Sequence, residues 1–538
     1  MYRQLQTASL HHSLNTCCAL IVLSVGSIAA ADERPSIERL MPAGGQRGTS
    51  VDVKFLGKAG DGELKVLTEA DSLSFAIAEN KESAVVAISA EARPGIHWLR
   101  FYNEFGATEL KPFVVGLIPE SAEIEPNARI AEAQPVMLPS VTINGVLEKA
   151  GDVDTCAVTL TRGQTLLATM LAHRGLGSPM DGVLQVVNDK GTVVAQNDDD
   201  SGPDPLITFQ APVDGTWYVR TFAFPATPNS TIGFAGGADF QYRLTLTTKP
   251  VIVHSSPLVR FEQDAETALV LHGWNLTATA VSLPIGQLVI SDGFALPHVL
   301  RHIEVPSVTE EQLTADRMLT LPIAMTGHIL SPGERDQFTV HAKKDQKLSF
   351  SVQALLLGSM LDPVLAVHDS DGKLIMENDD ISDEHRDAEL HLTIPADGIF
   401  RVTVRDRFAH FGDRWFYLLR SEETRATFSL SLKSAAFTLT SAEPLEIPVA
   451  VARRHGFTEA IEFRLEGLPE GVTVECQRSE KDGESSKAVV LRLTVSEPVA
   501  SQGSIRITAE SVDSKLQQPV TFETADGAVI RDVWLTVR

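Results

Sequence analysis

The sequence predicts an all-β protein, built as a string of β-sandwich modules. Short stretches in which apolar and polar residues alternate, such as VDVKFLG, YRLTLTT and FRVTVRD, recur along the chain between Gly, Pro and Asp residues. Helical periodicity is almost absent. The 538 residues exceed what a single hydrophobic core normally serves, so we expect several modules of ordinary size.

Residues 1–31 have the features of a secretory signal peptide. A weakly basic start is followed by an apolar run from Cys17, and Ala29 and Ala31 have the small-x-small spacing that signal peptidase accepts. The apolar run is short for a membrane-spanning helix, so an uncleaved anchor ranks second. We therefore expect a secreted or periplasmic protein of the cell envelope, with no membrane-spanning segment after cleavage.

Charge and cysteine content narrow the choice of partners. The net charge is −24, and so acidic a surface repels phosphate backbones and leaves carboxylates free for cations, which disfavours nucleic-acid binding.

Beyond the signal peptide only Cys156 and Cys476 remain, in separate predicted modules, so each module must be stable through its own core. Cys156 alternates inward in DTCAVTL, and we expect it to be a small buried residue.

Two parts of the chain repeat each other, beginning at Leu138 and Leu321. In order, the copies share Leu-Pro, a Gly, Gly-acid-x-Asp, Ser-x-x-Asp, a Gly turn, Asn-Asp-Asp and a strand after PVDG or PADG. So many matches in register indicate a duplicated module. Adjacent aspartates on a strand point to opposite faces, so the Asn-Asp pairs are expected to cap turns. These pairs are Asn197 with Asp198 and Asn378 with Asp379.

Three sets of segments carry resemblances to known families. The segments EIEPNARIAEAQPV, INGVLEKAGDVDTCAV, QNDDD and APVDGTWYV in the first copy, and the second copy from LPIAMTGHIL onward, resemble the bacterial pre-peptidase C-terminal (PPC) domain. That domain is a jelly-roll-like β-sandwich often appended to secreted proteases, and it is related to the collagen-binding domain of clostridial collagenases. The glycines and prolines between Pro35 and Gly57 are similar to those of an IPT/TIG immunoglobulin-like domain. The segment RRHGFTEAIEFRLEGLPEGVTV resembles another Ig-like module.

These resemblances imply a domain organisation in six parts. The expected parts are a signal peptide at 1–31, an IPT/TIG-like Ig-like domain at 32–118, a first PPC-like sandwich at 119–249, a short Ig-like β segment at 250–318, a second PPC-like sandwich at 319–433 and a C-terminal Ig-like domain at 434–538. They support a fold and do not by themselves support an activity.

The PPC resemblance also implies a structural calcium site in the first copy. In the collagenase-type relatives, calcium binds where a Glu-x-Glu-x-Asn segment meets an acidic loop, and calcium prefers six to eight hard oxygen ligands. The matching residues are Glu123, Glu125 and Asn127, with Asp152 and Asp154 as loop partners. Alternatively, the Glu-x-Glu-Pro-Asn segment is only a solvated linker. The second copy lacks this segment, although Glu334 and Asp336 remain, so calcium is not expected there.

For function, the sequence favours a non-catalytic protein that binds a cell-surface, matrix or polymer ligand. It contains no His-Glu-x-x-His, Gly-x-Ser-x-Gly or P-loop motif. Phe222, Phe224 and Phe234 lie in a predicted loop and are candidate ligand contacts, although half of each alternating aromatic set could be core. One alternative is an accessory or targeting subunit of a separately encoded secreted protease or other hydrolase. Another is a hydrolase with an unfamiliar acidic site at Asp198 and Asp379.

Overall fold

The computed structural model describes residues 34–538 except 69–70, 201, 228–232, 285, 383–384, 497–499 and 525. The expected signal peptide therefore lies outside the described residues. Strands hold 55% of the chain and helices 3%, which confirms the all-β prediction. Within the described part of the chain, no helix is long and apolar enough to cross a membrane.

Residues 34–118 form two facing sheets. Their strands are β1 (Ser36–Met41), β2 (Gly44–Gln46), β3 (Ser50–Lys58), β4 (Lys65–Leu67), β5 (Leu73–Ile77), β6 (Ser83–Ile88), β7 (Gly95–Asn103), β8 (Gly106–Ala107) and β9 (Lys111–Gly116). One sheet has the order β1-β3-β6-β5 and the other β2-β9-β7-β4, with β8 paired to β7. Phe55 of β3 packs edge-on against Phe101 of β7 across the core.

The first repeat is a sandwich of two five-stranded sheets. Its elements are β10 (Glu120–Ala122), η1 (Ile130–Glu132), β11 (Gln134–Pro135), β12 (Ser140–Val146), β13 (Asp154–Leu160), β14 (Thr165–Leu171), α1 (His173–Leu176), β15 (Met180–Val187), β16 (Val193–Asn197), β17 (Leu206–Gln210), β18 (Gly215–Pro225) and β19 (Gln241–Thr247). The sheet orders are β10-β12-β19-β14-β17 and β11-β13-β18-β15-β16. Cys156 is buried in the core between them, as predicted, and burial raises the pKa of its thiol to about 12.

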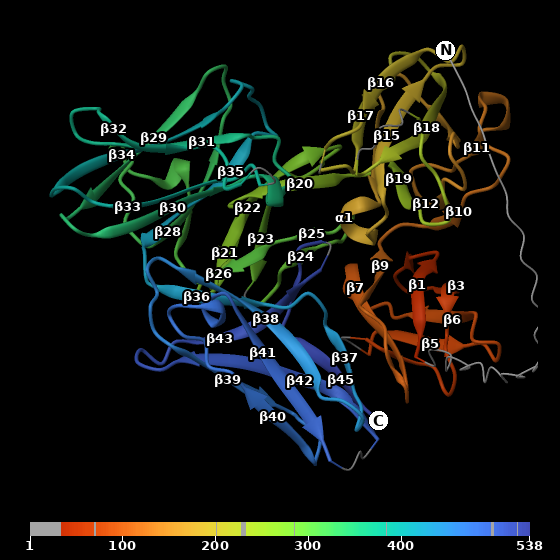
Figure 1. The fold of residues 1–538 in the computed structure, drawn as a ribbon. Coiled ribbons are helices and arrows are strands. Elements are labelled where there is room, and N and C mark those ends of the chain that lie inside the picture. Colours follow the sequence, from red (N-terminus) through yellow and green to blue (C-terminus); the bar gives the residue numbers. More distant parts are fainter. Residues whose placement is uncertain are drawn as a thin grey trace, which may run out of the picture.

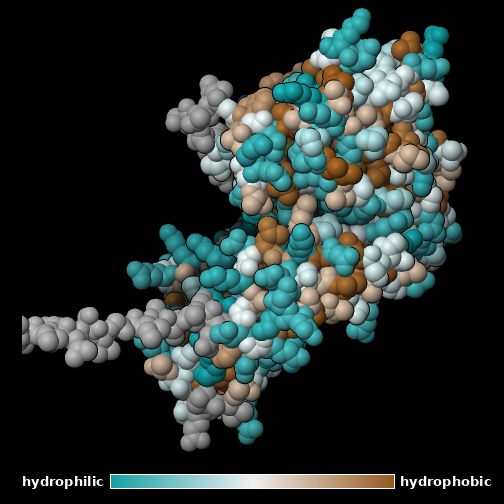
Figure 2. All heavy atoms as spheres, turned by 90° about the vertical axis from the view of Figure 1, so that its right-hand side faces the viewer, coloured by the Kyte–Doolittle hydropathy of each residue, from teal (hydrophilic) through white to brown (hydrophobic). Residues whose placement is uncertain are grey.

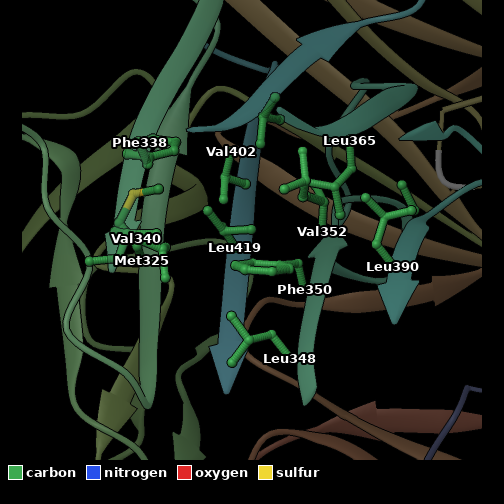
Figure 3. Packing of buried hydrophobic residues seen from close by; sticks show 14 of the residues in the cluster. Met325, Phe338, Val340, Leu348, Phe350, Val352, Leu365, Leu390, Val402 and Leu419 are labelled. Atoms are coloured by element: carbon green, nitrogen blue, oxygen red, sulfur yellow. The ribbon is translucent and has the colours of Figure 1, made fainter. Parts of the chain in front are cut away.

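The second repeat has the same topology. Its elements are β27 (Ser307–Thr309), η2 (Glu310–Gln312), β28 (Ile323–His328), β29 (Arg335–Ala342), β30 (Lys347–Gln353), η3 (Leu355–Leu357), β31 (Pro363–His368), β32 (Leu374–Asn378), β33 (Ala388–Thr393), β34 (Gly398–Asp406) and β35 (Phe416–Glu423). The sheets β27-β28-β35-β30-β33 and β29-β34-β31-β32 match those of the first repeat strand for strand, apart from β11. Phe338 of β29, which corresponds to Cys156, lies in the core with Phe350 and Leu419 (Figure 3).

A shorter intermediate segment connects the two repeats. Its strands are β20 (Val251–Ser256), β21 (Val259–Phe261), β22 (Glu266–Trp274), β23 (Ala280–Pro284), β24 (Val289–Ile290), β25 (His298–Val299) and β26 (Arg301–Ile303). They form the sheet β20-β22-β23 and the pairs β21-β26 and β24-β25. Its own core is small and is built around Leu269, Leu271 and Leu283. Much of its stability must therefore come from packing against neighbouring units.

The C-terminal unit is one continuous ten-stranded arrangement. Its elements are β36 (Thr427–Ser431), β37 (Ala436–Leu439), β38 (Leu445–Arg454), β39 (Ile461–Glu466), β40 (Val472–Cys476), η4 (Glu484–Ser486), β41 (Ala488–Val495), β42 (Ser501–Ser511), β43 (Gln517–Glu523), β44 (Val529–Ile530) and β45 (Asp532–Val537). Strand β43 pairs with both β42 and β36, and so joins the strands on the β42 side to those on the β36 side. Along β41, buried and exposed residues alternate without exception, which is the pattern that predicted a strand here.

Two units begin earlier than the sequence predicted. Strand β27 already belongs to a sheet of the second repeat, upstream of residue 319, and β36 belongs to the C-terminal sheet, upstream of residue 434. Both strands are short and lie outside the repeated motifs. Only their pairing partners reveal which unit each strand joins. Strand β27 pairs with β28, and β36 pairs with β38 and β43.

The last unit returns to contact the first (Figure 1). The rings of Tyr102 and Trp534 lie 4.7 Å apart, and the Ala435 backbone N–H donates to Glu109 at 3.2 Å. The two repeats also touch directly, because Arg414 of the second forms an ion pair with Asp200 of the first. The last unit is therefore in contact with the first, and the second repeat with the first repeat.

Candidate functional site

The residues expected to bind calcium meet at one edge of the first repeat. Strand β10 runs parallel to β12, and the chain leaves it at Glu123 and passes Glu125 and Asn127. The turn between β12 and β13 carries Asp152, and Asp154 is the first residue of β13. Strand pairing therefore places the two segments next to each other, although they are far apart in the sequence.

Tyr242 of β19 links Glu123 to Asp154. Its hydroxyl donates to Asp154 Oδ2 at 2.6 Å and lies 3.1 Å from Glu123 Oε2. The other oxygen of Glu123 accepts the backbone N–H of Val146 at 2.9 Å. A Cβ at Gly145 would lie 2.3 Å from the Tyr242 ring and 2.4 Å from Glu123, so this shared glycine is required for the close approach.

Three of the five predicted ligands offer oxygens close enough for one ion. Ligand atoms of Glu125, Asp152 and Asp154 all lie within 4.8 Å of one another. Glu125 Oε2 accepts the backbone N–H of Asn127 at 2.8 Å, which holds the segment in place. Asn127 Oδ1 and Asp154 Oδ1 are buried without a hydrogen-bond partner. An unpaired buried oxygen costs about 1–3 kcal/mol, and a bound cation would remove that cost.

The electrostatics of the site favour a cation. Burial, followed by the charge of Glu123, raises the pKa of Asp154 to about 9. Burial also raises the pKa of Glu123. None of the groups that shift these two pKa values is basic. The donors are all hard oxygens, so the residues fit calcium better than a nitrogen-preferring metal.

The second repeat contains the same arrangement of carboxylates and tyrosine, together with the positively charged side chain of an arginine. Glu310 Oε1 accepts the backbone N–H of His328 at 3.0 Å, as Glu123 accepts that of Val146. Tyr417 donates to Asp336 at 2.6 Å, as Tyr242 does to Asp154. The counterparts are thus Glu310 and Asp336.

The added feature is Arg317. Its Nη2 lies 2.8 Å from Glu310 Oε2 and 3.8 Å from Asp336 Oδ1. Its guanidinium also stacks over Phe338, 4.7 Å from the ring centroid. The first repeat has Cys156 in place of Phe338, and among its described residues no arginine is among the groups that shift the pKa values of Glu123 and Asp154.

For the second repeat, the sequence named Glu334 and Asp336 as the remaining loop acids and did not name Glu310. Glu334 accepts the backbone N–H groups of Leu330 and Ser331, both at 2.7 Å, and so only caps its own turn. Glu310 was hidden because it lies five residues closer to the shared glycine than Glu123 does. A search for a Glu directly after a short strand upstream of the repeat would have found it, because Glu123 follows β10 and Glu310 follows β27.

The Asn-Asp-Asp segments close loops in both repeats. Asn197 Oδ1 accepts the backbone N–H of Leu206 at 2.9 Å, and Asn378 Oδ1 accepts that of Glu389 at 3.0 Å. The structural role predicted for the two asparagines is confirmed. The third acid of the first segment, Asp200, has the separate role of pairing with Arg414.

The three candidate aromatic contacts form one cluster, but two of them are not in a loop. Phe222 and Phe224 belong to β18, because the strand continues to Pro225, and that part of the prediction is wrong. Phe222 is 7% exposed and stacks on Phe234 with ring centroids 4.4 Å apart. Phe234 is 39% exposed. Of the three, Phe234 presents the most accessible ring for a ligand.

Residues 152–223 match the profile of the bacterial pre-peptidase C-terminal domain family. These residues form a PPC domain. The matched PPC segment begins at Asp152 of the candidate site and ends within β18. The PPC resemblance of the second repeat and the IPT/TIG resemblance of the first unit remain predictions.

The PPC region also has a relative among curated proteins. A probable subtilase-type serine protease of Deinococcus radiodurans is 34% identical over 97 residues, which cover 18% of this chain and 13% of the protease. The chain therefore spans only a small part of that relative.

Two solved structures align with most of the chain at low similarity. They are native Escherichia coli alpha-2-macroglobulin (TM-score 0.16, 8% identity, 95% of this chain and 47% of that one) and the N-terminal eight Ig domains of Down Syndrome Cell Adhesion Molecule (TM-score 0.13, 11% identity, 89% and 62%).

Proposed function

We propose that this protein is a non-catalytic, secreted or periplasmic binding protein whose PPC domain is stabilised by calcium. The observation that carries the calcium assignment is the comparison between the repeats. One copy of the carboxylate pair is neutralised by Arg317, whereas the other leaves Asp154 Oδ1 buried and unpaired. Glu123, Glu125, Asn127, Asp152 and Asp154 would hold the ion.

Thermal unfolding of the full chain with calcium or chelator tests this assignment. We expect calcium to raise the midpoint of one transition, because a ligand that binds only the native state stabilises it by about 2.7 kcal/mol at 100 times its Kd. Glu125→Gln should abolish the shift. Glu132→Gln should keep it, because that exposed acid lies outside the site. An unchanged wild-type midpoint would rule the site out.

The proposed ligand is an extracellular polymer or protein, contacted through Phe234. An exposed aromatic ring that packs against a strand is a typical recognition element. On the face shown in Figure 2, hydrophobic residues are interspersed with hydrophilic ones. Such a surface is compatible with a soluble partner, and binding to purified polysaccharide or collagen is the direct measurement.

The match to a subtilase-type protease favours a second candidate function, that of an accessory subunit for a separately encoded secreted protease. Co-purification with a protease, lost on Phe234→Ser, would support this role over polymer binding. The non-catalytic assignment is tested separately. Hydrolysis of any substrate that disappears in Asp198→Asn or Asp379→Asn, with folding intact, would overturn it.

A further inference from the structure

Three histidines from different strands converge where the intermediate segment meets the second repeat. His254 of β20 and His272 of β22 are direct partners across the ladder, and their rings stack 4.3 Å apart. His328 ends β28 of the second repeat, and its Nε2 shares a hydrogen bond of 3.2 Å with His254 Nε2. Ligand-capable nitrogens of all three lie within 4.8 Å of one another.

The cluster is shielded from water on one side and open on the other. His254 is 2% exposed and stacks on Phe416, and its Nδ1 has no hydrogen-bond partner. His328 is 6% exposed, and His272 is partly exposed.

The open side faces a groove of about 810 Å³ that can supply a fourth ligand. Glu311 and Asp413 line this groove together with His272 and His328. Glu311 also has a carboxylate oxygen within 4.8 Å of a His328 nitrogen. Glu310 is already engaged by Arg317 and the His328 backbone, so Glu311 or a water is the available ligand.

We propose that His254, His272 and His328 form a transition-metal site of the zinc class, which crosslinks the intermediate segment to the second repeat. Three histidines with an open fourth position are a common zinc arrangement, and imidazole suits zinc, copper and nickel. Nitrogens bound to one tetrahedral zinc lie about 3.3 Å apart, close to the separation between His254 and His328. The nitrogen donors distinguish this site from the all-oxygen calcium site.

The comparison between repeats supports a specific role for His328. At the same position, directly after the shared glycine, the first repeat has Val146. Both residues donate their backbone N–H to the glutamate of their repeat, so the fold of the repeat does not require the imidazole. His328→Val therefore removes a ligand while keeping a side chain that this position accepts.

Zinc and cobalt binding to the metal-stripped full chain, in excess calcium and magnesium, tests the proposal. We expect one tightly bound zinc per chain, a visible Co²⁺ spectrum typical of tetrahedral coordination and a raised unfolding midpoint. His272→Gln and His328→Val should each weaken binding by more than about tenfold, since even loss of an outer-shell partner costs that much. The exposed His302→Gln is the matched control and should bind as the wild type does.

Two results would overturn the proposal. One is a wild-type chain that binds no zinc or cobalt under these conditions, in which case the histidines only pack the junction. The other is binding that both variants retain, which would place the metal on surface carboxylates. Glu125→Gln should leave zinc binding unchanged, so failure of the calcium site and failure of the zinc site are separable.

Discussion

Arg317 and Glu310 form an ion pair with a 2.8 Å distance between Nη2 and Oε2, at the position where Tyr242 of the first repeat contacts the carboxylates of Glu123 and Asp154. A side chain thus supplies in one repeat the positive charge that we assign to calcium in the other. This relationship makes the two repeats internal controls for each other.

Arg317→Gln should destabilise the second repeat without any dependence on calcium. The change leaves Glu310 and Asp336 partly or fully buried without a counter-charge. Because Arg317 itself is 38% exposed, we expect the free energy of unfolding to fall by about 2 kcal/mol, which lies between the values for exposed and buried ion pairs. Urea unfolding measures the loss. Arg335→Gln, an exposed position on β29, should change stability by less than about 0.5 kcal/mol.

The stability of the second repeat should fall as pH rises through the range in which Asp336 titrates. Burial, and then the charge of Glu310, raises the pKa of Asp336 to about 7, so the folded state binds this proton more tightly than the unfolded state does. The stabilisation that protonated Asp336 gives the folded state is fully present below about pH 4 and is lost as the pH rises to about 7. Asp336→Asn cannot ionise and should remove this slope from urea midpoints measured across the range. If the slope is unchanged in Asp336→Asn, the pH dependence of stability does not come from Asp336.

Arg414 and Asp200 should couple the two repeats energetically. Their side chains are 21% and 8% exposed, and the guanidinium also lies over Trp274, 5.7 Å from the ring centroid. A double-mutant cycle with Arg414→Gln and Asp200→Asn should give a coupling energy of about 1–3 kcal/mol. The half-exposed pair Arg492 and Glu446 should give only about 0.2–1 kcal/mol. Equal couplings would show that the contact between repeats adds nothing.

Substitution of Phe222 should mainly affect stability, whereas substitution of Phe234 should mainly affect ligand affinity. Phe222→Ala removes a buried ring and should cost about 3 kcal/mol of stability. Phe234→Ala removes a ring that is 39% exposed, so it should cost less stability and lower ligand affinity more than tenfold, as aromatic hot spots do. Chemical denaturation and a binding assay on the same samples provide the measurements. Normal binding by Phe234→Ala would place the ligand elsewhere.

The candidate calcium site could be predicted only in part. Glu125, Asp152 and Asp154 were named from a family resemblance, and the structure brings them within 4.8 Å of one another. Tyr242 was not named, because a tyrosine within the alternation of β19 looks like any core residue until its hydroxyl is seen near two carboxylates.

The sequence by itself determined that this protein is all-β, because strand alternation and turn residues are local properties of a few neighbouring residues. It also determined the register of the two repeats, since their shared motifs follow in the same order. Only the tertiary structure decided which charges neutralise each other, as with Arg317, and which histidines meet, as with His254 and His328. Those contacts join strands that are distant in sequence, and strand pairing, which is not encoded by any local pattern, brings them together.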